Sequence, residues 1–235
     1  MSEIVKKEKN SRISLNMFQL KMIALITMTI DHIGAALLPQ YLFLRVIGRI
    51  SFPIYCFVIV VGFCKTSNVW KYLLRLVGFA CISEIFFDLA FFGKIYYPNH
   101  QNVFFTLFLG LFLLILVKGL RFGPTLGVRI INYVLEYVCV VLICGISIFM
   151  KTDYTLYGIL MIYFFFVLQY NKFMQGIFIA FVNMQLMGGI QTFATISLIP
   201  IFMYNGEKGN DKFKKIFYLY YPLHLLVIFI LECAI

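Results

Sequence analysis

The chain has 235 residues, of which 62% are apolar and only 13% are charged, and its mean hydropathy is +0.93. A soluble globular chain is about 45–50% apolar and about 25% charged. The composition therefore excludes a soluble or secreted domain and predicts membrane-spanning helices, which are recognised as apolar runs of roughly 18 or more residues. Twenty Lys and Arg against ten Asp and Glu give a net charge of +10. This excess indicates either nucleic-acid binding or the orientation of a membrane protein, and the positions of the charges along the chain distinguish the two.

Apolar runs bounded by charges or turn residues predict an all-α polytopic membrane bundle of about nine transmembrane helices. The predicted spans are 20–38, 42–64, 72–92, 103–119, 131–149, 154–170, 173–187, 189–204 and 216–233. Gly188-Gly189 forms either a tight turn between two short spans or a break within one longer element, so the range is eight to ten. The chain is then a polar cytoplasmic N-terminal segment, 1–18, followed by a single transmembrane domain, 19–235, with no extramembrane domain.

The basic residues predict the orientation. With the N-terminus inside, fifteen Lys and Arg lie on the cytoplasmic side, within 6–21, 65–71, 118–129, 172 and 208–215, and only Lys94 and Lys151 lie outside. This asymmetry predicts a multi-pass protein of the cytoplasmic membrane with its C-terminus outside. The surplus charge then faces anionic membrane lipid, and nucleic-acid binding is not needed to explain it.

Charged and imidazole side chains inside the predicted spans are functional candidates, because a charge near the bilayer centre costs at least about 2.5 kcal/mol. They are Asp31, His32, Arg45, Arg49, Arg75, Glu84, Asp88, Glu136, His224 and Glu232. At 1.5 Å per residue, His32 and Glu84 each lie about 18 Å from the cytoplasmic end of their helix, and Arg49 lies at nearly the same level. A base, an acid and a cation are therefore expected to meet in one layer.

The spacing of Lys21 and His32 places both on one helical face. Eleven residues return the helix to within about 20° of its starting direction and separate the two side chains by about 16 Å along the axis. That spacing is comparable to the extended pantetheine arm of coenzyme A. For His32 the alternative is a histidine that only packs.

The remaining charges fall into pairs. Arg45 with Arg49, and Glu84 with Asp88, are each four residues apart and share a helical face. The two carboxylates either contribute to a site or neutralise the two arginines as structural ion pairs, and both interpretations stay open. Asp31 points about 100° away from its neighbour His32. An acid that orients His32 is therefore expected to be Glu84 or Asp88.

The other two histidines are expected to contribute less. His100, in the loop YYPNHQN, is expected to be a solvated loop residue. His224, in FYLYYPLHLL, is expected nearer the cytoplasmic face, where it either lines a coenzyme channel or is structural. The six cysteines contain no Cys-x-x-Cys pair, and we expect no metal site.

Five ordered motifs resemble the TraX family, which takes its name from the conjugation protein needed for N-terminal acetylation of F-type pilin. They are LKMIALITMTIDHIGAALLP, LRVIGRISFPIYCFVIVVGFCKT, YLLRLVGFACISEIFFDLAF, QNVFFTLFLGL, and IPIFMYNGEKG with YLYYPLHLL. More remotely, Lys21 followed by ten residues and His32 is similar to the first helix of the acyltransferase-3 superfamily, with Lys in place of the usual Arg. The SFPIYCFVIVVGF stretch resembles the second helix of that superfamily.

The resemblance implies a membrane acyltransferase that uses acetyl-CoA or another acyl-CoA and acts on an envelope peptide, glycan or lipid, with His32 as general base. The residues assigned to catalysis are His32, Arg49, Glu84, Asp88, Asp31 and Arg45, those assigned to acyl-CoA are Lys21, Lys71, Arg75, His224 and Asn205, and those assigned to the acceptor are Asn102 and Thr106. The alternatives are a proton-coupled transporter and a non-enzymatic assembly factor for conjugative or envelope structures.

Overall fold

The structure is a computed structural model and describes residues 14–120, 123, 125–210 and 214–234. Within these residues the chain is helical, and its only strand-like pairings are two isolated bridges. Helices α1 to α5 span Met17–Ala36, Leu42–Gly48, Ser51–Lys65, Val69–Phe92 and Val103–Gly119. Helices α6 to α8 span Leu126–Phe149, Thr155–Val167 and Lys172–Phe181, and the π-helical η1, the 3-10 helix η2, α9 and α10 follow at Val182–Met187, Gly189–Ser197, Leu198–Phe202 and Lys214–Ala234.

Among the residues that the structure describes, three helical stretches are long and apolar enough to cross a membrane: Leu42–Lys65, Leu126–Phe149 and Ile216–Ala234. Val103–Gly119, Thr155–Val167 and Gly189–Phe202 are shorter apolar helices. Each predicted span coincides with a helical part of the chain, with its ends shifted by a few residues. The all-helical fold class is confirmed, and these stretches are typical of a membrane protein. Of the predicted N-terminal segment, residues 1–13 lie outside the described residues.

Asparagines begin four of the helices. The side chains of Asn16, Asn68, Asn102 and Asn171 accept hydrogen bonds from backbone N–H groups in the first turns of α1, α4, α5 and α8. At Asn16 the contact is reciprocal, because its own N–H donates to the Gln19 side chain at 2.9 Å. Such caps satisfy backbone donors that have no partner within the helix, and they fix where each apolar run begins.

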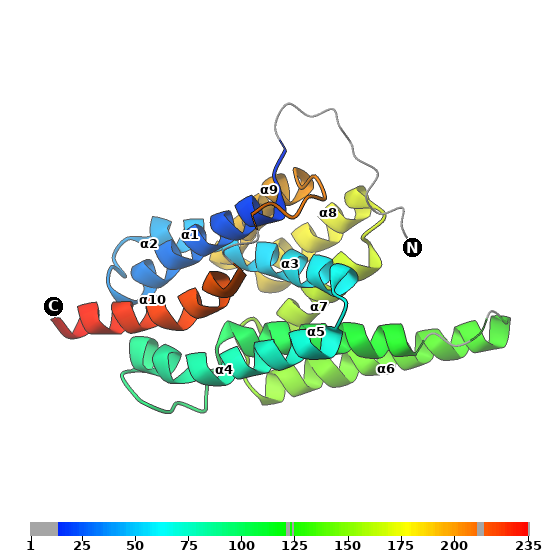
Figure 1. The fold of residues 1–235 in the computed structure, drawn as a ribbon, viewed down its shortest axis with the longest axis horizontal. Coiled ribbons are helices and arrows are strands. Elements are labelled where there is room, and N and C mark those ends of the chain that lie inside the picture. The colour runs from blue at the N-terminus through cyan, green and yellow to red at the C-terminus, as the bar shows by residue number, and fades with distance from the viewer. Residues whose placement is uncertain (1–13, 121–122, 124, 211–213, 235) are drawn as a thin grey trace.

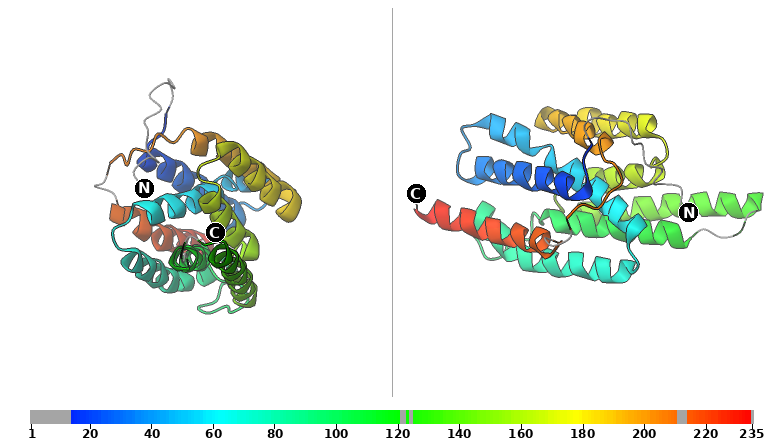
Figure 2. Two further views of the ribbon diagram at one scale, coloured as in Figure 1. Left: turned by 90° about the vertical axis from the view of Figure 1, so that its right-hand side faces the viewer. Right: turned by 45° about the horizontal axis from the view of Figure 1, so that its top comes forward.

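Most helices run roughly along one direction (Figure 1), and α3 lies in the middle of the bundle. It contacts α1, α5, α7, η2 and α9, and most of its residues from Ser51 to Val60 are buried. Helix α10 lies beside α1 and α4 although the chain reaches it last (Figure 2). Residues far apart in the sequence therefore meet between α1, α3, α4 and α10.

Two short backbone pairings tie the ends of the bundle. At one end Leu15 N–H donates to the Met203 carbonyl and Asn205 N–H donates to the Leu15 carbonyl, each at 2.9 Å. At the other end Gln101 N–H donates to Lys151 at 3.0 Å and Asp153 N–H donates to Gln101 at 2.9 Å. The second pairing brings the 93–102 loop beside the turn between α6 and α7.

Gly188-Gly189 is a turn between two elements. Both glycines have positive φ, at 62° and 55°, which glycine adopts without steric cost. The elements on either side, η1 and η2, contact each other, and Gln191 donates to Asn183 across the turn at 3.1 Å. Of the two alternatives left by the sequence, the tight turn is therefore confirmed.

Candidate functional site

A cavity of about 390 Å³ lies near the end of the bundle where the 93–102 loop and the 150–154 turn meet. Its volume falls within the range of about 300–1,000 Å³ that small-molecule sites occupy. Aromatic rings form much of its wall, Phe52, Phe91 and Tyr154 among them. Besides Tyr55 and Tyr154, the ionisable side chains that line it are Asp31, His32, Arg45, Arg49, His100 and Asp153.

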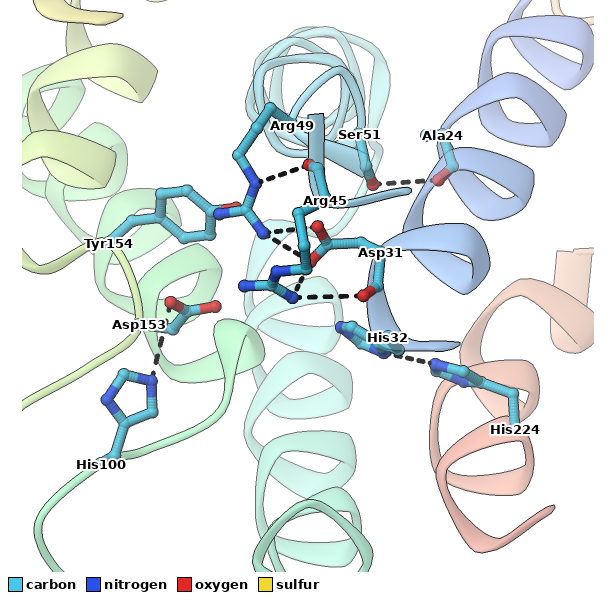
Figure 3. Close-up of polar contacts among 10 residues, drawn as sticks. All are labelled: Ala24, Asp31, His32, Arg45, Arg49, Ser51, His100, Asp153, Tyr154 and His224. Carbon is cyan, nitrogen blue, oxygen red and sulfur yellow. Dashed lines mark hydrogen bonds and ion pairs between the residues drawn. The ribbon is translucent and has the colours of Figure 1, made fainter. Parts of the chain in front are cut away.

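Asp31 binds both arginines of the site (Figure 3). Arg49 Nη2 lies 2.6 Å from Asp31 Oδ1 and 2.5 Å from Oδ2, and Arg45 Nη1 lies 2.9 Å from Oδ2. The side chains of Asp31 and Arg49 are only 11% and 13% exposed. Two cations therefore share one carboxylate at the wall of the cavity, and Asp153 supplies a second carboxylate to the same cavity.

Close packing of α1 against α2 places Asp31 beside the two arginines. A β-carbon on Gly34 would lie 2.7 Å from Leu44 Cβ, so α1 and α2 approach each other closely at that point. A turn at Arg49 and Ile50 separates α2 from α3. Ser51, at the start of α3, donates a hydrogen bond to the Ala24 carbonyl of α1 at 2.9 Å. The arginine-bearing turn is thus fixed against α1.

His32 faces the same cavity and meets His224 from α10. His32 Nδ1 lies 2.7 Å from His224 Nε2, and His224 Nδ1 lies 2.9 Å from the Tyr220 carbonyl oxygen. Phe91 and Tyr221 contact the His32 ring edge-on, with centroids 5.3 and 5.9 Å away. The sequence placed His224 nearer the cytoplasmic face than His32, whereas the structure places it at the level of His32, because α10 packs along α1.

The turn between α6 and α7 supplies Asp153 and Tyr154. Lys151, Tyr154 and Thr155 have positive φ, at 54°, 60° and 41°, a conformation that costs non-glycine residues energy and concentrates at functional sites. Thr106 Oγ1 donates to the Asp153 carbonyl. The Tyr154 ring stacks on Phe52 with centroids 3.6 Å apart, and its hydroxyl accepts from Arg49 Nη1 at 3.4 Å.

His100 is a loop residue whose side chain is 43% exposed, as the sequence indicates, and it also forms part of the cavity wall. Its ring stacks on Phe87 with centroids 5.7 Å apart, and its Nε2 lies 3.7 Å from Asp153 Oδ1. That distance is longer than a hydrogen bond and is that of an ion pair. The Asp153 carboxylate raises the pKa of His100 above its ordinary value, while burial lowers it, and Glu84 and Asp88 add to the increase.

A second, smaller cavity of about 80 Å³ adjoins the first, and Met28, Tyr55 and Val103 line both. Lys21 lines the second cavity, with its Nζ 5.4 Å from the centroid of the Phe217 ring. Lys21 and His32, which the sequence places on one face of a helix, therefore line two neighbouring cavities.

Glu84 and Asp88 do not pair with the arginines or with His32. Glu84 Oε2 accepts from the backbone and side-chain nitrogens of Asn102, and Asp88 Oδ2 accepts from Tyr97 N–H at 2.6 Å. The prediction that these acids orient His32 or neutralise the arginines is wrong. The carboxylate that pairs with the arginines is Asp31, which faces α2, and the hydrogen-bond partner of His32 is His224.

The other predicted site residues line neither cavity. Asn102 is fully buried and caps α5, and Thr106 holds the Asp153 turn, so both position the site without lining the first cavity. Arg75 lies 5.6 Å from the centroid of the Tyr72 ring, which lines the second cavity. Lys71 is exposed at the start of α4, and Asn205 accepts from Glu207 N–H at 2.9 Å beside the start of α1.

Comparison with known proteins identifies the family. The model of the TraX protein family matches residues 16–232, which include every element that builds the two cavities. The chain belongs to the TraX family. The TraX-family resemblance seen in the five sequence motifs is thereby confirmed.

Two relatives illustrate how far the similarity reaches. The probable fimbrial assembly protein FimC, serogroup H1, of Dichelobacter nodosus is 30% identical, over 92% of this chain and 95% of its own. The uncharacterized protein RP591 of Rickettsia prowazekii is 38% identical over 31% of this chain and 27% of its own. No solved structure matches the chain. These matches do not bear on the resemblance to the acyltransferase-3 superfamily.

Proposed function

We propose that this TraX-family chain is a membrane acyltransferase. It moves an acyl group, acetyl by family resemblance, from cytoplasmic acyl-CoA to an amine or hydroxyl of an envelope peptide, glycan or lipid. The observation that carries the proposal is the shared cavity. His32 and two arginines held by one carboxylate line it together, and the cavity beside it reaches Lys21.

The proposal includes a topology. The chain crosses the bacterial inner membrane about nine times, with its N-terminus in the cytoplasm and its C-terminus outside. Lys21, Lys71, Arg75 and Asn205 then lie toward the cytoplasm, where the phosphates of acyl-CoA arrive. His100 and Asp153 lie toward the outside, where an envelope acceptor arrives. Reporter fusions after Lys94 and Lys151 should read as external, and a cytoplasmic signal at either position would contradict this orientation.

The chemistry follows from the groups that line the cavity. His32 takes the proton from the attacking amine or hydroxyl, and the acceptor atom bonds to the thioester carbon. Arg49, with Arg45, stabilises the oxyanion in a site of low dielectric. When the carbon–sulfur bond breaks, the coenzyme thiolate takes the proton from His32. Ser51 lines the cavity, but its hydroxyl donates to Ala24, so we propose direct transfer without an acyl-enzyme.

The experiment that tests the function has two parts. Mass spectrometry of envelope peptides, glycans and lipids from cells with and without the gene should reveal one class that loses an acyl mass. Purified protein in nanodiscs should then transfer labelled acetyl from acetyl-CoA to that class. If no envelope molecule changes in mass, and purified protein releases no coenzyme A with any acceptor fraction, the enzyme proposal is wrong.

A second candidate function is a non-enzymatic assembly factor for fimbriae or related envelope fibres. The name of the Dichelobacter nodosus relative, a probable fimbrial assembly protein, favours it. The two functions differ in what they need from His32. An assembly factor would keep its function in a His32→Ala variant that inserts and folds, whereas the acyltransferase would lose it.

A further inference from the structure

Two imidazoles and a backbone carbonyl form a chain of hydrogen bonds from α10 to the cavity. The ring planes of His32 and His224 lie within 12° of each other, and their centroids are 5.0 Å apart. That separation equals the 2.7 Å between Nδ1 and Nε2 extended by one ring radius at each end. The rings therefore meet edge to edge, as a direct imidazole–imidazole hydrogen bond requires.

The direction of each hydrogen bond follows from the last acceptor. A backbone carbonyl only accepts, so His224 Nδ1 carries the proton that it shares with the Tyr220 oxygen 2.9 Å away. In a neutral ring, His224 Nε2 is then a lone-pair acceptor. His32 Nδ1 must therefore donate to it, and His32 Nε2 is left without a proton.

We propose that His224 is a positioning residue that fixes His32 in the Nδ1–H tautomer and so presents the basic Nε2 to the cavity. No residue of the described chain is hydrogen-bonded to that nitrogen, and the His32 ring edge opposite His224 turns toward the side where the two arginines lie (Figure 3). A residue that hydrogen-bonds one ring nitrogen selects the tautomer of the whole ring.

The His224 ring is itself held in place. The Tyr220 ring lies nearly parallel to it, at 11° and 5.1 Å between centroids, and the Tyr220 hydroxyl lies 2.8 Å from Thr29 Oγ1 on α1. His224 is 7% exposed. One residue of α10 thus clamps α10 to α1 one turn away from the histidine pair, which keeps the two imidazoles in register.

The arrangement also supports the protonated form of His32. When His32 Nε2 takes the acceptor's proton, its Nδ1–H bond to His224 becomes charge-assisted and stronger. This contribution matters because the neighbouring arginines disfavour a third cation. When the proton passes from Nε2 to the leaving thiolate, His32 returns to its first tautomer with its Nδ1–H bond intact. The kinetic part of this inference rests on the proposed function, while the tautomer does not.

The test reads the tautomer directly. The sequence contains only three histidines, so ¹⁵N-histidine labelling in nanodiscs gives three pairs of ring signals, which single His→Gln variants assign. Wild-type protein should show a protonated Nδ1 and a bare Nε2 at His32. His224→Phe removes the acceptor and should give a mixture of His32 tautomers. Leu223→Phe, which places the same ring on the exposed face of α10, is the matched control and should leave the His32 signals unchanged.

His224→Gln separates hydrogen bonding from ring packing. Its side-chain oxygen can accept from His32 Nδ1, so the tautomer should survive, and kcat should recover relative to His224→Phe. The Phe variant should lose about 10²-fold or more in kcat, since a wrong tautomer removes most of the base's contribution, with little change in KM for acyl-CoA.

The inference is overturned if wild-type His32 carries its proton on Nε2, a measurement that needs no variant, or if the His32 signals do not respond to His224→Phe. If the tautomer behaves as described but no acyl transfer is found in wild-type protein, the positioning role of His224 stands and the acyltransferase proposal fails.

Discussion

Gly48 lies directly against Asp31. A β-carbon at position 48 would stand 2.1 Å from Asp31 Cβ and 2.2 Å from its Oδ1. Position 48 is therefore occupied by the one residue that lets α2 approach α1 this closely. The contact explains how Asp31 reaches an arginine on either side of Gly48, at 45 and 49, and makes the geometry of the site depend on a residue with no side chain.

We predict that Gly48→Ala displaces Asp31 and damages both stability and activity. Overpacking of this kind costs about 1–3 kcal/mol, so the melting temperature in detergent should fall. Gly78→Ala is the matched control, because no atom lies within 4 Å of a β-carbon at position 78 on α4. That change should be neutral or slightly stabilising, as Ala favours helix over Gly by about 0.8–1.0 kcal/mol. Equal effects of the two substitutions would contradict the close contact.

We predict that Asp31→Asn is more damaging alone than together with Arg49→Gln. The single change leaves two cations without their carboxylate, and breaking a buried ion pair in this way costs about 3–5 kcal/mol. Removing Arg49 as well relieves part of that charge, so the double variant should be more stable than the sum of the single effects predicts. Thermal unfolding of all four proteins measures the coupling, and strictly additive shifts would show that the pair contributes nothing.

The sequence predicted which side chains form the site better than it predicted their partners. The spacing of Arg45 and Arg49 placed both on one face, and both do contact a single carboxylate. That carboxylate is Asp31, whereas Glu84 and Asp88 bind Asn102 and Tyr97 N–H. Helical periodicity predicts which residues share a face of one helix, but it does not predict which other helix packs against that face. Gly34 and Gly48, which let α1 and α2 approach each other closely, are the residues in the sequence that could have indicated this packing.

The local sequence pattern did not predict the contacts that residues from the second half of the chain make with the site. His224 is 192 residues from His32, and the site meets it only because α10 packs along α1. Asp153 and Tyr154 lie at the start of the predicted span 154–170, and the pairing of the 150–154 turn with Gln101 holds them at the cavity. A clue was present in Asp153, an acid in a short turn of an otherwise apolar stretch. Nothing in the pattern indicated the positive φ values that direct it inward.

We predict that Lys21→Gln weakens acyl-CoA binding about two- to fivefold, the effect of one partly exposed charge pair. Lys21 lines the second cavity, whereas Lys94 lies in the loop at the other end of the bundle, so Lys94→Gln is the control. The loss should shrink at high salt, because screening shortens electrostatic reach. Titration calorimetry in nanodiscs measures the affinity. If both variants lose the same affinity for acyl-CoA, Lys21 is not part of the coenzyme site.

We predict that His100 stabilises the fold more in acid than in base. Its pKa is raised by Asp153, so the folded state favours protonated His100. This contribution is fully present below the ordinary histidine pKa of about 6.5 and disappears as pH rises through the higher folded value. The melting temperature of wild type should exceed that of His100→Gln by more at about pH 5.5 than at about pH 9. A difference that is independent of pH would mean that His100 contributes only through its ring contacts with Phe87.

The last prediction concerns His32. Its imidazole lines the cavity beside Arg45 and Arg49, and His224 holds its other ring nitrogen. If it is the general base, His32→Ala should insert and fold yet lose roughly 10² to 10⁴ in turnover. His32→Gln should be nearly as poor, because an amide keeps a hydrogen bond to His224 but cannot take up a proton. The wild-type rate should fall on acidification, since a protonated imidazole has no lone pair to accept the acceptor's proton.

The control for His32 must separate chemistry from packing. Leu25, two turns earlier on α1, is buried and lines neither cavity, so Leu25→Ala perturbs the packing of α1 while leaving both imidazoles and their hydrogen bonds in place. It should lower the melting temperature with most of the turnover per folded molecule retained. His32→Ala should show the opposite pattern, with turnover lost and folding kept. If instead His32→Ala lowers expression or melting temperature while each folded molecule stays active, His32 is a packing histidine, and the base has to be sought elsewhere in the cavity.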